Sequence, residues 1–196
     1  MGIDQDSFIL DAGALNRQMH KIFENYRQPV LVEEYIEGRE LNVSILGNEN
    51  PQILPISEID FSKMPPGLPK ICSYDAKWEE GSPEFRFTIP RCPASLTPEE
   101  EIRIQGVSLL AYQIMECRDY GRVDIRMQTD GTPFILEINA NPDISRDAGM
   151  TRSAKKAGYT YPEFIGRILE HALIRIETSP PRGKVRHVAP EREILD

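Results

Sequence analysis

The stretch GRVDIRMQTDGTPFILEINANP, residues 121–142, contains two alternating runs around a turn signal. The first run, with a period of two, predicts a strand whose two faces differ in chemistry. One face carries Val123, Ile125 and Met127, and the other carries Arg122, Asp124 and Arg126. The sequence 128–131, Gln-Thr-Asp-Gly, is typical of a tight turn, so a second strand is expected to follow directly and to pair with the first.

The second run covers residues 133–139 and alternates in the same way. Its period predicts one face with Phe134, Leu136 and Ile138 and another with Ile135, Glu137 and Asn139. If the two runs form a hairpin, four polar side chains can share one surface: Arg122, Asp124, Glu137 and Asn139. Carboxylate and amide oxygens are hard ligands that suit Mg²⁺ or Mn²⁺, and arginine presents a fork for phosphate or carboxylate oxygens.

Length and composition indicate an ordinary soluble globular chain. It has 196 residues, of which 40% are hydrophobic and 28% charged, enough for one domain or two small ones. No apolar run is long enough to cross a bilayer, so we expect no membrane span. The formal charge of −8 argues against nucleic-acid binding through a basic surface. A small anionic ligand would need locally placed lysine and arginine.

The cysteines indicate the redox environment. Cys72, Cys92 and Cys117 are odd in number, lack the close pairs of a metal site and follow no signal peptide. We therefore expect three buried or half-buried thiols in a reducing cytoplasm.

The first part of the chain predicts one helix and a hairpin. Asp11 can cap a helix that ends near Tyr26. Strands are expected over 29–36 and 40–46, joined by a turn at 37–39. Glu33 and Glu40 then bracket Tyr35 and Ile36, which can give an adenine an apolar wall while the carboxylates accept amino or hydroxyl donors. The alternative is a hairpin with a solvated acidic edge.

The middle of the chain predicts a strand over 52–59, a surface loop over 60–85 and a helix from Thr97 to about Cys117. Lys77 lies in this loop, where it is either solvated or part of a lid over a phosphate. We expect the helix to bury a single stripe of apolar side chains against the sheet. That stripe consists of Ile104, Val107, Leu110, Ala111 and Ile114.

After Pro142 the chain predicts a polar loop over 143–150, a short helix over 151–157 that is stopped by Gly158, and a last helix that begins at Tyr161. The expected buried stripe of the last helix is Phe164, Ile165, Ile168, Leu169, Ala172, Leu173 and Ile176. Residues 179–196 have few apolar side chains and are expected to form a flexible tail.

Several segments in this order carry a family resemblance: LVEEYIEGRELNVSILG, YDAKW, CPASLT, GRVDIRMQTDGTPFILEINANP and AGYTYPEFIGRILEHAL. Together, from about Val30 to Leu173, they resemble the C-terminal part of the D-alanine:D-alanine ligases and their ATP-grasp relatives. The resemblance implies an α+β fold, the ATP-grasp C-terminal lobe, with a mainly antiparallel sheet and packed helices. It further implies that residues 1–28 are a remnant of the first ATP-grasp lobe, that 29–178 form the catalytic lobe and that 179–196 are the tail.

The resemblance also implies roles for individual residues. Glu33, Tyr35, Ile36 and Glu40 would hold the adenosine of ATP, with Glu40 on the ribose hydroxyls. Lys77 would reach the terminal phosphates from a mobile lid. Two Mg²⁺ ions would be held by Asp124, Glu137 and Asn139, and Arg122 would face the transferred phosphoryl group and the developing oxyanion. In the reaction so implied, a carboxylate attacks ATP to give an acyl phosphate, and an amine then attacks the acyl carbon to form an amide.

The chain departs from that family in two respects. After the Asn-Pro pair such ligases usually continue with glycine and a serine-containing segment, whereas this chain has Asp143 to Asp147. Asp143 and Asp147 would repel a free carboxylate unless Arg146 offsets them, so an acceptor other than D-alanine is expected. The family's N-terminal domain and most of its first lobe have no counterpart here. Two other classes of protein therefore stay open: a nucleotide- or metal-binding module that a partner chain or self-association completes, and a structural domain that retains an acidic hairpin.

Overall fold

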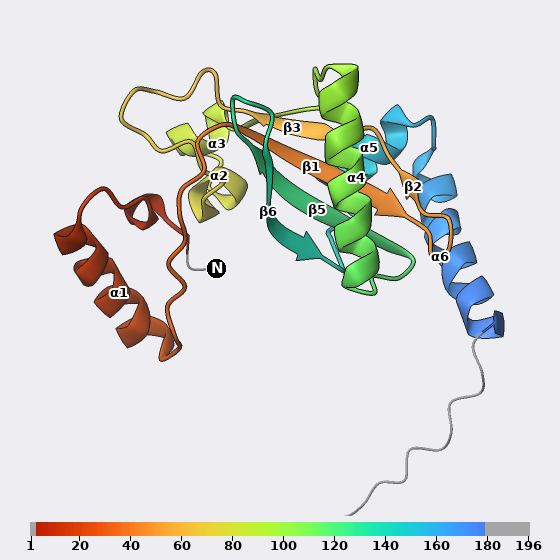
Figure 1. Cartoon of the computed structure of the whole chain (residues 1–196), viewed down its shortest axis with the longest axis horizontal. Helices are drawn as coiled ribbons and strands as arrows, with labels where there is room; N and C mark the ends of the chain where they lie inside the picture. Colours follow the sequence, from red (N-terminus) through yellow and green to blue (C-terminus); the bar gives the residue numbers. More distant parts are fainter. Residues whose placement is uncertain (1–2, 179–196) are drawn as a thin grey trace, which may run out of the picture.

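The computed structural model describes residues 3–178, which form an antiparallel sheet with helices on both faces (Figure 1). The strands are β1 (Arg39–Leu46), β2 (Gln52–Ile53), β3 (Ser57–Asp60), β4 (Ile89–Arg91), β5 (Tyr120–Met127) and β6 (Pro133–Asn139). Their order in the sheet is β4-β3-β1-β5-β6, and β2 pairs with one end of β1. The α-helices are α1 (Ala12–Tyr26), α2 (Tyr74–Trp78), α3 (Pro83–Phe87), α4 (Pro98–Ile114), α5 (Gly149–Lys156) and α6 (Tyr161–Thr178), preceded by the 3₁₀ turn η1 (Gln5–Ser7).

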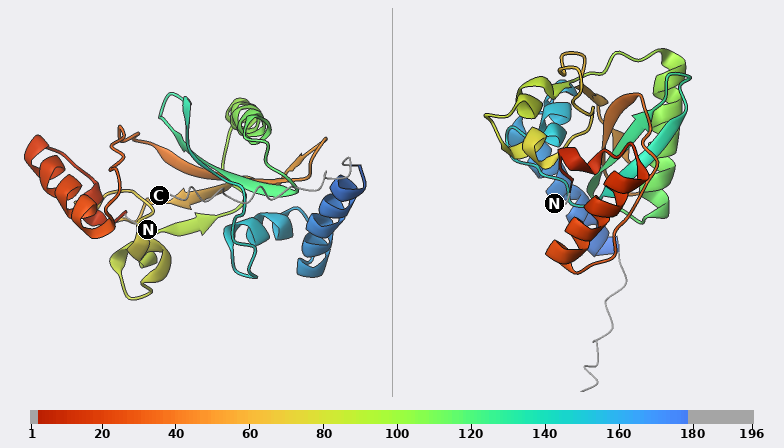
Figure 2. Two further views of the ribbon diagram at one scale, coloured as in Figure 1. Left: turned by 90° about the horizontal axis from the view of Figure 1, so that it is seen from below. Right: turned by 90° about the vertical axis from the view of Figure 1, so that its left-hand side faces the viewer.

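Helices lie on both faces of the sheet, while α1 lies beyond one end of it (Figure 2). α4 covers one face, where its Ile104 and Tyr112 pack with Leu41 and Val43 of β1 and with Val123 of β5. α2, α3, α5 and α6 lie on the other face. The second core cluster is on that side: Leu46, Leu54, Met150, Ala154 and Phe164. Because a strand alternates its side chains, the polar face of β5 is turned away from α4.

The predicted hairpin is confirmed, but the faces of its second strand were predicted partly wrongly. β5 and β6 pair antiparallel, with a register shift between Asp124 and Ile125. Glu137 pairs with Asp124 and Ile135 with Ile125, so Leu136 is the extra residue of a β-bulge. The bulge reverses the alternation. Phe134 therefore shares the polar face with Glu137 and Asn139, and Ile135 lies on the other face.

The predicted strand over 29–36 is wrong. Residues 29–37 have no regular secondary structure, and β1 begins at Arg39. The reason is that both edges of β1 are already paired: β5 occupies one edge over its full length, and β3 and β2 share the other. No edge of β1 therefore remains for residues 29–36 to pair with.

The expected strand over 52–59 is interrupted at Pro55, which has no N–H group to donate to a ladder, and appears as β2 and β3. The predicted loop over 60–85 contains two short helices. Ser73 caps α2 and Ser82 caps α3, each by accepting a hydrogen bond from a backbone N–H three residues later.

The two predicted helix starts are confirmed. The Asp11 side chain caps α1, and Thr97 and Glu100 form a reciprocal capping box at the start of α4. The predicted buried stripe of α4 is correct for Ile104 and Ala111 but wrong for Leu110 and Ile114, which are 57% and 68% exposed. Because α4 has no layer outside it among residues 3–178, only the side chains toward the sheet can be buried.

The C-terminal elements follow the prediction in extent. α5 ends just before Gly158, which has a φ of +97°, and α6 begins at Tyr161. Phe164 is buried as expected, but three members of the predicted stripe of α6 are exposed, namely Leu169, Leu173 and Ile176. The predicted flexible tail, 179–196, lies outside the described residues. Within 3–178, no helix is long and apolar enough to cross a bilayer.

An ion pair joins α6 to the turn that precedes β5. Asp119 accepts hydrogen bonds from Arg175, with Nη2 at 2.6 Å from Oδ2 and Nε at 3.0 Å from Oδ1. Asn48 donates a further one to the same carboxylate. The Arg175 hydrogen bonds, more than any other contact, hold the pKa of the Asp119 carboxyl below its usual value. A depressed carboxyl pKa stabilises the folded state above the ordinary pKa of aspartate, and this contribution is lost as the pH falls through the folded-state pKa.

We expect Asp119→Asn to lower the free energy of unfolding at pH 7 by about 2 kcal/mol, because the ion pair between Asp119 and Arg175 is lost. Asparagine tolerates the left-handed backbone at this position, where φ is +67°, so the change removes the side-chain charge and one acceptor oxygen without straining the backbone. Urea unfolding at several pH values measures the effect. The difference in unfolding free energy between wild type and variant should disappear as the pH falls from about 5 to about 2. A difference that stays constant with pH would show that the charge of Asp119 is not its cause.

Candidate nucleotide and metal site

The register of three strands brings the predicted polar residues onto one surface. β5 and β6 place Asp124 opposite Glu137 and Arg122 opposite Asn139. β1, on the other side of β5, places Glu40 opposite Arg126. Directly opposed residues of antiparallel strands point to the same face, so this surface combines carboxylates, an amide and two guanidinium groups.

Arg122 and Asp124 form the centre of the surface. Arg122 Nε donates to Asp124 Oδ1, and Arg122 Nη2 donates to Asp124 Oδ2, both at 2.6 Å. Asn42 Nδ2 donates to Asp124 Oδ1 at 2.8 Å. The bidentate contact fixes the plane of the guanidinium, and within the described residues the Nη1 hydrogens of Arg122 make no hydrogen bond.

Glu137 is the most accessible carboxylate of the group. Its side chain is 59% exposed, and Oε1 lies 3.9 Å from Arg122 Nη2. Partial burial, followed by the neighbouring Asp124 carboxylate, raises the pKa of the Glu137 carboxyl, while Lys77 and Arg122 oppose that rise. The neighbouring carboxylates of Asp124 and Glu137 repel each other, and a cation bound between them would remove that repulsion.

Glu40 is buried, with 7% of its surface exposed, and Arg126 is buried beside it at 4%. Arg126 Nη2 lies 3.2 Å from Glu40 Oε2. Burial raises the pKa of the Glu40 carboxyl, and the charge of Arg126 opposes the rise. Glu40 was predicted to belong to the candidate site and Arg126 was not, although the strand period put Arg126 on the polar face.

Arg126 connects β5 to two separate segments. It donates hydrogen bonds to the carbonyl oxygens of Gly38 and Lys70, and its guanidinium carbon lies 5.5 Å from the Tyr35 ring centre and 5.4 Å from that of Phe61. These distances are within the range of cation–π attraction. Arg126 thus holds the segment before β1 and the loop after β3 against the sheet.

The segment before β1 carries the predicted adenosine contacts. Glu33 is exposed, Tyr35 is 38% exposed and Ile36 is buried. Tyr35 contacts Phe8 edge-to-face, with ring centres 4.8 Å apart. The predicted hairpin is absent, yet Tyr35 still reaches the site because it packs on Arg126.

Residues of the predicted lid lie close to the carboxylates. Lys77, on α2, is exposed, and its charge acts to lower the pKa of both Glu40 and Glu137. Cys72 belongs to the same cluster and was missed by sequence reasoning, since nothing in its local pattern marks it. Burial above all, and then the Glu40 carboxylate, raises the pKa of the Cys72 thiol to about 11. Cys72, Cys92 and Cys117 are all partly buried, as expected, and none of the three forms a disulfide.

The loop after β6 is held by its own contacts. Asp143 Oδ1 accepts from the Ser145 backbone N–H at 2.8 Å, which forms an Asx turn. The Arg146 guanidinium carbon lies 4.4 Å from the centre of the Tyr161 ring on α6. Arg146 therefore stacks on α6.

The chemistry of the donor set fits a divalent cation of the Mg²⁺ type. Asp124 Oδ1 already accepts two hydrogen bonds, but Oδ2 accepts one and keeps a lone pair. The Glu137 carboxylate is exposed, and the Asn139 amide oxygen is oriented by the Asn141 backbone N–H at 3.1 Å. Between residues 3 and 178, no three His, Cys, Asp or Glu side chains are grouped closely enough to hold a metal ion, so the set depends on Asn139 or on ligand oxygens.

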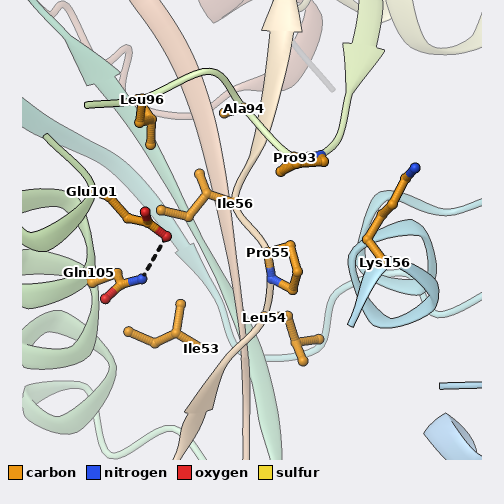
Figure 3. A pocket seen from close by; sticks show the side chains of 10 residues that line it. All are labelled: Ile53, Leu54, Pro55, Ile56, Pro93, Ala94, Leu96, Glu101, Gln105 and Lys156. Carbon is orange, nitrogen blue, oxygen red and sulfur yellow. Dashed lines mark hydrogen bonds between the residues drawn. The ribbon is translucent and has the colours of Figure 1, made fainter. Parts of the chain in front are cut away.

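A cavity of about 500 Å³ lies elsewhere, between α4 and α5 and across residues 53–56 (Figure 3). Its walls are mostly apolar, with three polar side chains at the rim: Glu101, Gln105 and Lys156. A second cavity of about 170 Å³ lies between α1 and the start of α2. Neither of these two cavities is lined by any of the predicted site residues.

Comparison with known proteins relates the chain to one group of enzymes. The model of the family described as "D-ala D-ala ligase C-terminus" matches residues 11–170. The D-alanine–D-alanine ligase of Pseudothermotoga lettingae is 34% identical over 144 residues, which cover 74% of this chain and 45% of that enzyme. The uncharacterized protein y4sG of Sinorhizobium fredii is 33% identical over 158 residues, or 81% of this chain and 45% of that protein.

Solved structures agree with the sequence comparison. The crystal structure of the D-alanine–D-alanine ligase from Bacillus anthracis complexed with ATP superposes with a TM-score of 0.68 at 26% identity. The match covers 88% of this chain and 50% of that enzyme. The chain thus spans about half the length of the relatives that it matches.

Proposed function

Because the chain belongs to the family of D-alanine–D-alanine ligase C-terminal domains, we propose that it supplies the catalytic lobe of an ATP- and Mg²⁺-dependent ligase that joins a carboxylate to an amine through an acyl phosphate. Its antiparallel sheet with packed helices is the fold of the ATP-grasp C-terminal lobe, as predicted. The observation that carries the proposal is the strand register, which places Arg122, Asp124, Glu137 and Asn139 together on the face opposite α4.

Each of these side chains has a role in the proposal. Asp124 Oδ2, Glu137 and Asn139 would hold Mg²⁺, which neutralises phosphate charge when bound. Asp124 also orients Arg122 through two hydrogen bonds. The Nη1 hydrogens of Arg122 would then face the oxyanion that develops during acyl transfer, and Lys77 would reach the terminal phosphates from α2. Phosphoryl transfer needs such positioned cations more than a covalent protein group.

The adenosine end rests on different contacts. Tyr35 and Ile36 would provide the apolar wall for adenine, with Glu33 accepting from donors at its edge. Glu40 would accept from the ribose hydroxyls through the oxygen that does not face Arg126. Since Arg126 packs on Tyr35 and binds Glu40, it acts in this proposal as a positioning residue for the nucleotide.

The amine acceptor is proposed to differ from D-alanine. Asp143 and Asp147 put negative charge in the loop after β6, and the guanidinium between them stacks on Tyr161. A free carboxylate on the acceptor would be repelled by these acids. An acceptor whose carboxylate is blocked avoids that repulsion.

Glu137→Gln tests the metal part of the site. We expect it to weaken Mg²⁺-dependent ATP binding by about tenfold or more, because an anionic oxygen ligand becomes neutral. Calorimetric titration of the chain with ATP, once in the presence of Mg²⁺ and once in the presence of EDTA, measures the loss of affinity. The Glu137 side chain is 59% exposed, so the fold should be unaffected.

A matched control is Glu49→Gln, an exposed glutamate in the turn after β1. The Glu49→Gln variant should bind ATP with the affinity of the wild type. Equal ATP affinity in wild type and Glu137→Gln would overturn the metal assignment, and an absence of ATP binding in a folded wild-type sample would favour the structural-domain alternative.

A nucleotide-binding module without turnover is the second candidate, since the chain spans about half the length of its relatives. An assay of amide formation by the 196-residue chain distinguishes a catalytic lobe of a ligase from a nucleotide-binding module. The assay supplies ATP, Mg²⁺ and an acyl donor with D-alanine or D-alanine amide as the acceptor. ATP binding without product would support the module.

A further inference from the structure

A row of three polar side chains crosses the sheet at the level of the candidate site. Asn42 of β1 lies directly opposite Asp124 of β5, and Asp124 lies directly opposite Glu137 of β6. Directly opposed residues of antiparallel strands point to the same face, so the three side chains are neighbours there. The half-buried Asn42 is the one member of this row without a role in the proposed function, and it was not predicted to belong to the site.

The hydrogen bonds of Asp124 show what Asn42 contributes. A carboxylate has about four acceptor positions, two on each oxygen. Oδ1 accepts two hydrogen bonds, from Asn42 Nδ2 at 2.8 Å and from Arg122 Nε at 2.6 Å, whereas Oδ2 accepts one, from Arg122 Nη2 at 2.6 Å. Asn42 therefore occupies the last acceptor position of Oδ1, and the position that remains for a cation is on Oδ2.

A second group of the same composition lies away from the site. Asp119 accepts hydrogen bonds from the amide of Asn48 at 3.0 Å and from the guanidinium of Arg175. There the Arg175 hydrogen bonds, above all, lower the pKa of the Asp119 carboxyl, as is usual for a carboxylate that pairs within the fold. Asn48, Asp119 and Arg175 thus show what such a group does when its role is structural.

Asp124 differs from Asp119 in having a second carboxylate directly opposite, that of Glu137. Burial, followed by the charge of Asp124, raises the pKa of the Glu137 carboxyl, so the two groups are close enough to repel each other. A group that only stabilises the fold gains nothing from this repulsion, whereas a cation that binds both carboxylates is attracted by both charges. Asn42 therefore orients a carboxylate that faces another carboxylate, which Asn48 does not do.

We propose that Asn42 is a positioning residue for the divalent cation of the proposed function, on which this inference rests. By occupying Oδ1, its amide restricts Asp124 to ligation through Oδ2. An amide suits this task, because it donates a hydrogen bond and adds no positive charge that would repel the cation. Loss of a group that orients a metal ligand typically weakens metal binding by about 10- to 100-fold.

Asn42→Leu is the decisive variant, because leucine branches as asparagine does but cannot donate a hydrogen bond. Calorimetric titration with ATP, once with Mg²⁺ and once with EDTA, gives two dissociation constants, and their ratio measures how much the cation strengthens binding. We expect this ratio to fall about tenfold. The dissociation constant in EDTA should not change, because Tyr35 and Glu40 keep their contacts with Arg126. Asn42→Ala, which also lacks the donor but adds no volume, should give the same result.

Asn48→Ala is the matched control, since it removes the same kind of amide–carboxylate hydrogen bond from Asp119. It should lower the melting temperature and leave the ratio of the two dissociation constants unchanged. An equal fall of that ratio in Asn42→Leu and Asn48→Ala would show that lost stability is the cause, and it would overturn the proposal.

A double variant tests whether Asn42 acts through Asp124. Asp124→Asn alone should lower the ratio, because it replaces a charged ligand. Adding Asn42→Leu to Asp124→Asn should then change the ratio by less than about twofold, since the group that Asn42 orients is already altered. Losses that add in full would overturn the proposal, because Asn42 would then act independently of Asp124.

The same titrations separate this inference from the proposed function. If the folded wild type binds no ATP, or binds it equally in Mg²⁺ and in EDTA, the proposed function is overturned and the inference with it. If the wild type shows the Mg²⁺ dependence and Asn42→Leu retains the full ratio, the inference alone is overturned.

Discussion

Replacing Arg126 with methionine is expected to lower the free energy of unfolding by about 3–5 kcal/mol. The change leaves Glu40 buried without its counter-charge and removes the donor to the carbonyl oxygens of Gly38 and Lys70. Methionine keeps most of the side-chain volume, so the loss is electrostatic rather than a cavity effect. Urea unfolding followed by circular dichroism measures it.

Two controls isolate the cause. Arg167→Gln removes an ion pair with Glu170 in which both side chains are 51% exposed, and it should cost less than about 0.5 kcal/mol. The double variant Glu40→Gln, Arg126→Met should recover part of the loss, because the uncompensated charge is gone. If the double variant is no more stable than Arg126→Met, the assignment of the loss to Glu40 is wrong.

Gly38→Ala is expected to lower the free energy of unfolding by about 3–5 kcal/mol. A Cβ at this position would lie 2.0 Å from the Met127 carbonyl oxygen, and the backbone φ is +150°. Both the strand end and the segment that carries Tyr35 would have to shift, so weaker ATP binding is expected together with the loss of stability. Thermal unfolding and ATP titration of the same sample measure the two effects.

Gly67→Ala is the control for backbone strain alone. Its φ is +91°, but nothing lies within 4 Å of an added Cβ. The free energy of unfolding of this variant should fall by only about 1–2 kcal/mol, which is the cost of an alanine in the left-handed conformation. Equal losses at Gly38 and Gly67 would show that the contact with Met127 is not the main cause.

Local patterns in the sequence were sufficient to predict the β5–β6 hairpin and the starts of α1 and α4. The turn signal at 128–131 and the period of two predicted the hairpin, and the cap residues Asp11 and Thr97 predicted two helix starts. These features depend on contacts between residues close in sequence, which is why they can be predicted without the fold.

Errors arose where distant segments compete for the same partner. Residues 29–36 have the composition of a strand, but β1 had no edge left to pair with them. The bulge at Leu136 turned Phe134 to the polar face, since the register of β6 is set by pairing along the whole of β5. Leu110 and Ile114 match the helical period, yet α4 packs on one layer only.

The sequence by itself determined which chemical groups form the candidate site: two carboxylates and an amide on a hairpin, an arginine beside them and a lysine in a preceding loop. The residue types and their spacing carry this information directly. Only the tertiary structure decided that Arg126 pairs with Glu40, that Cys72 lies beside the carboxylates and that one side of α4 stays exposed. Each of these depends on packing between segments far apart in the chain, and strand alternation and helical period do not specify such packing.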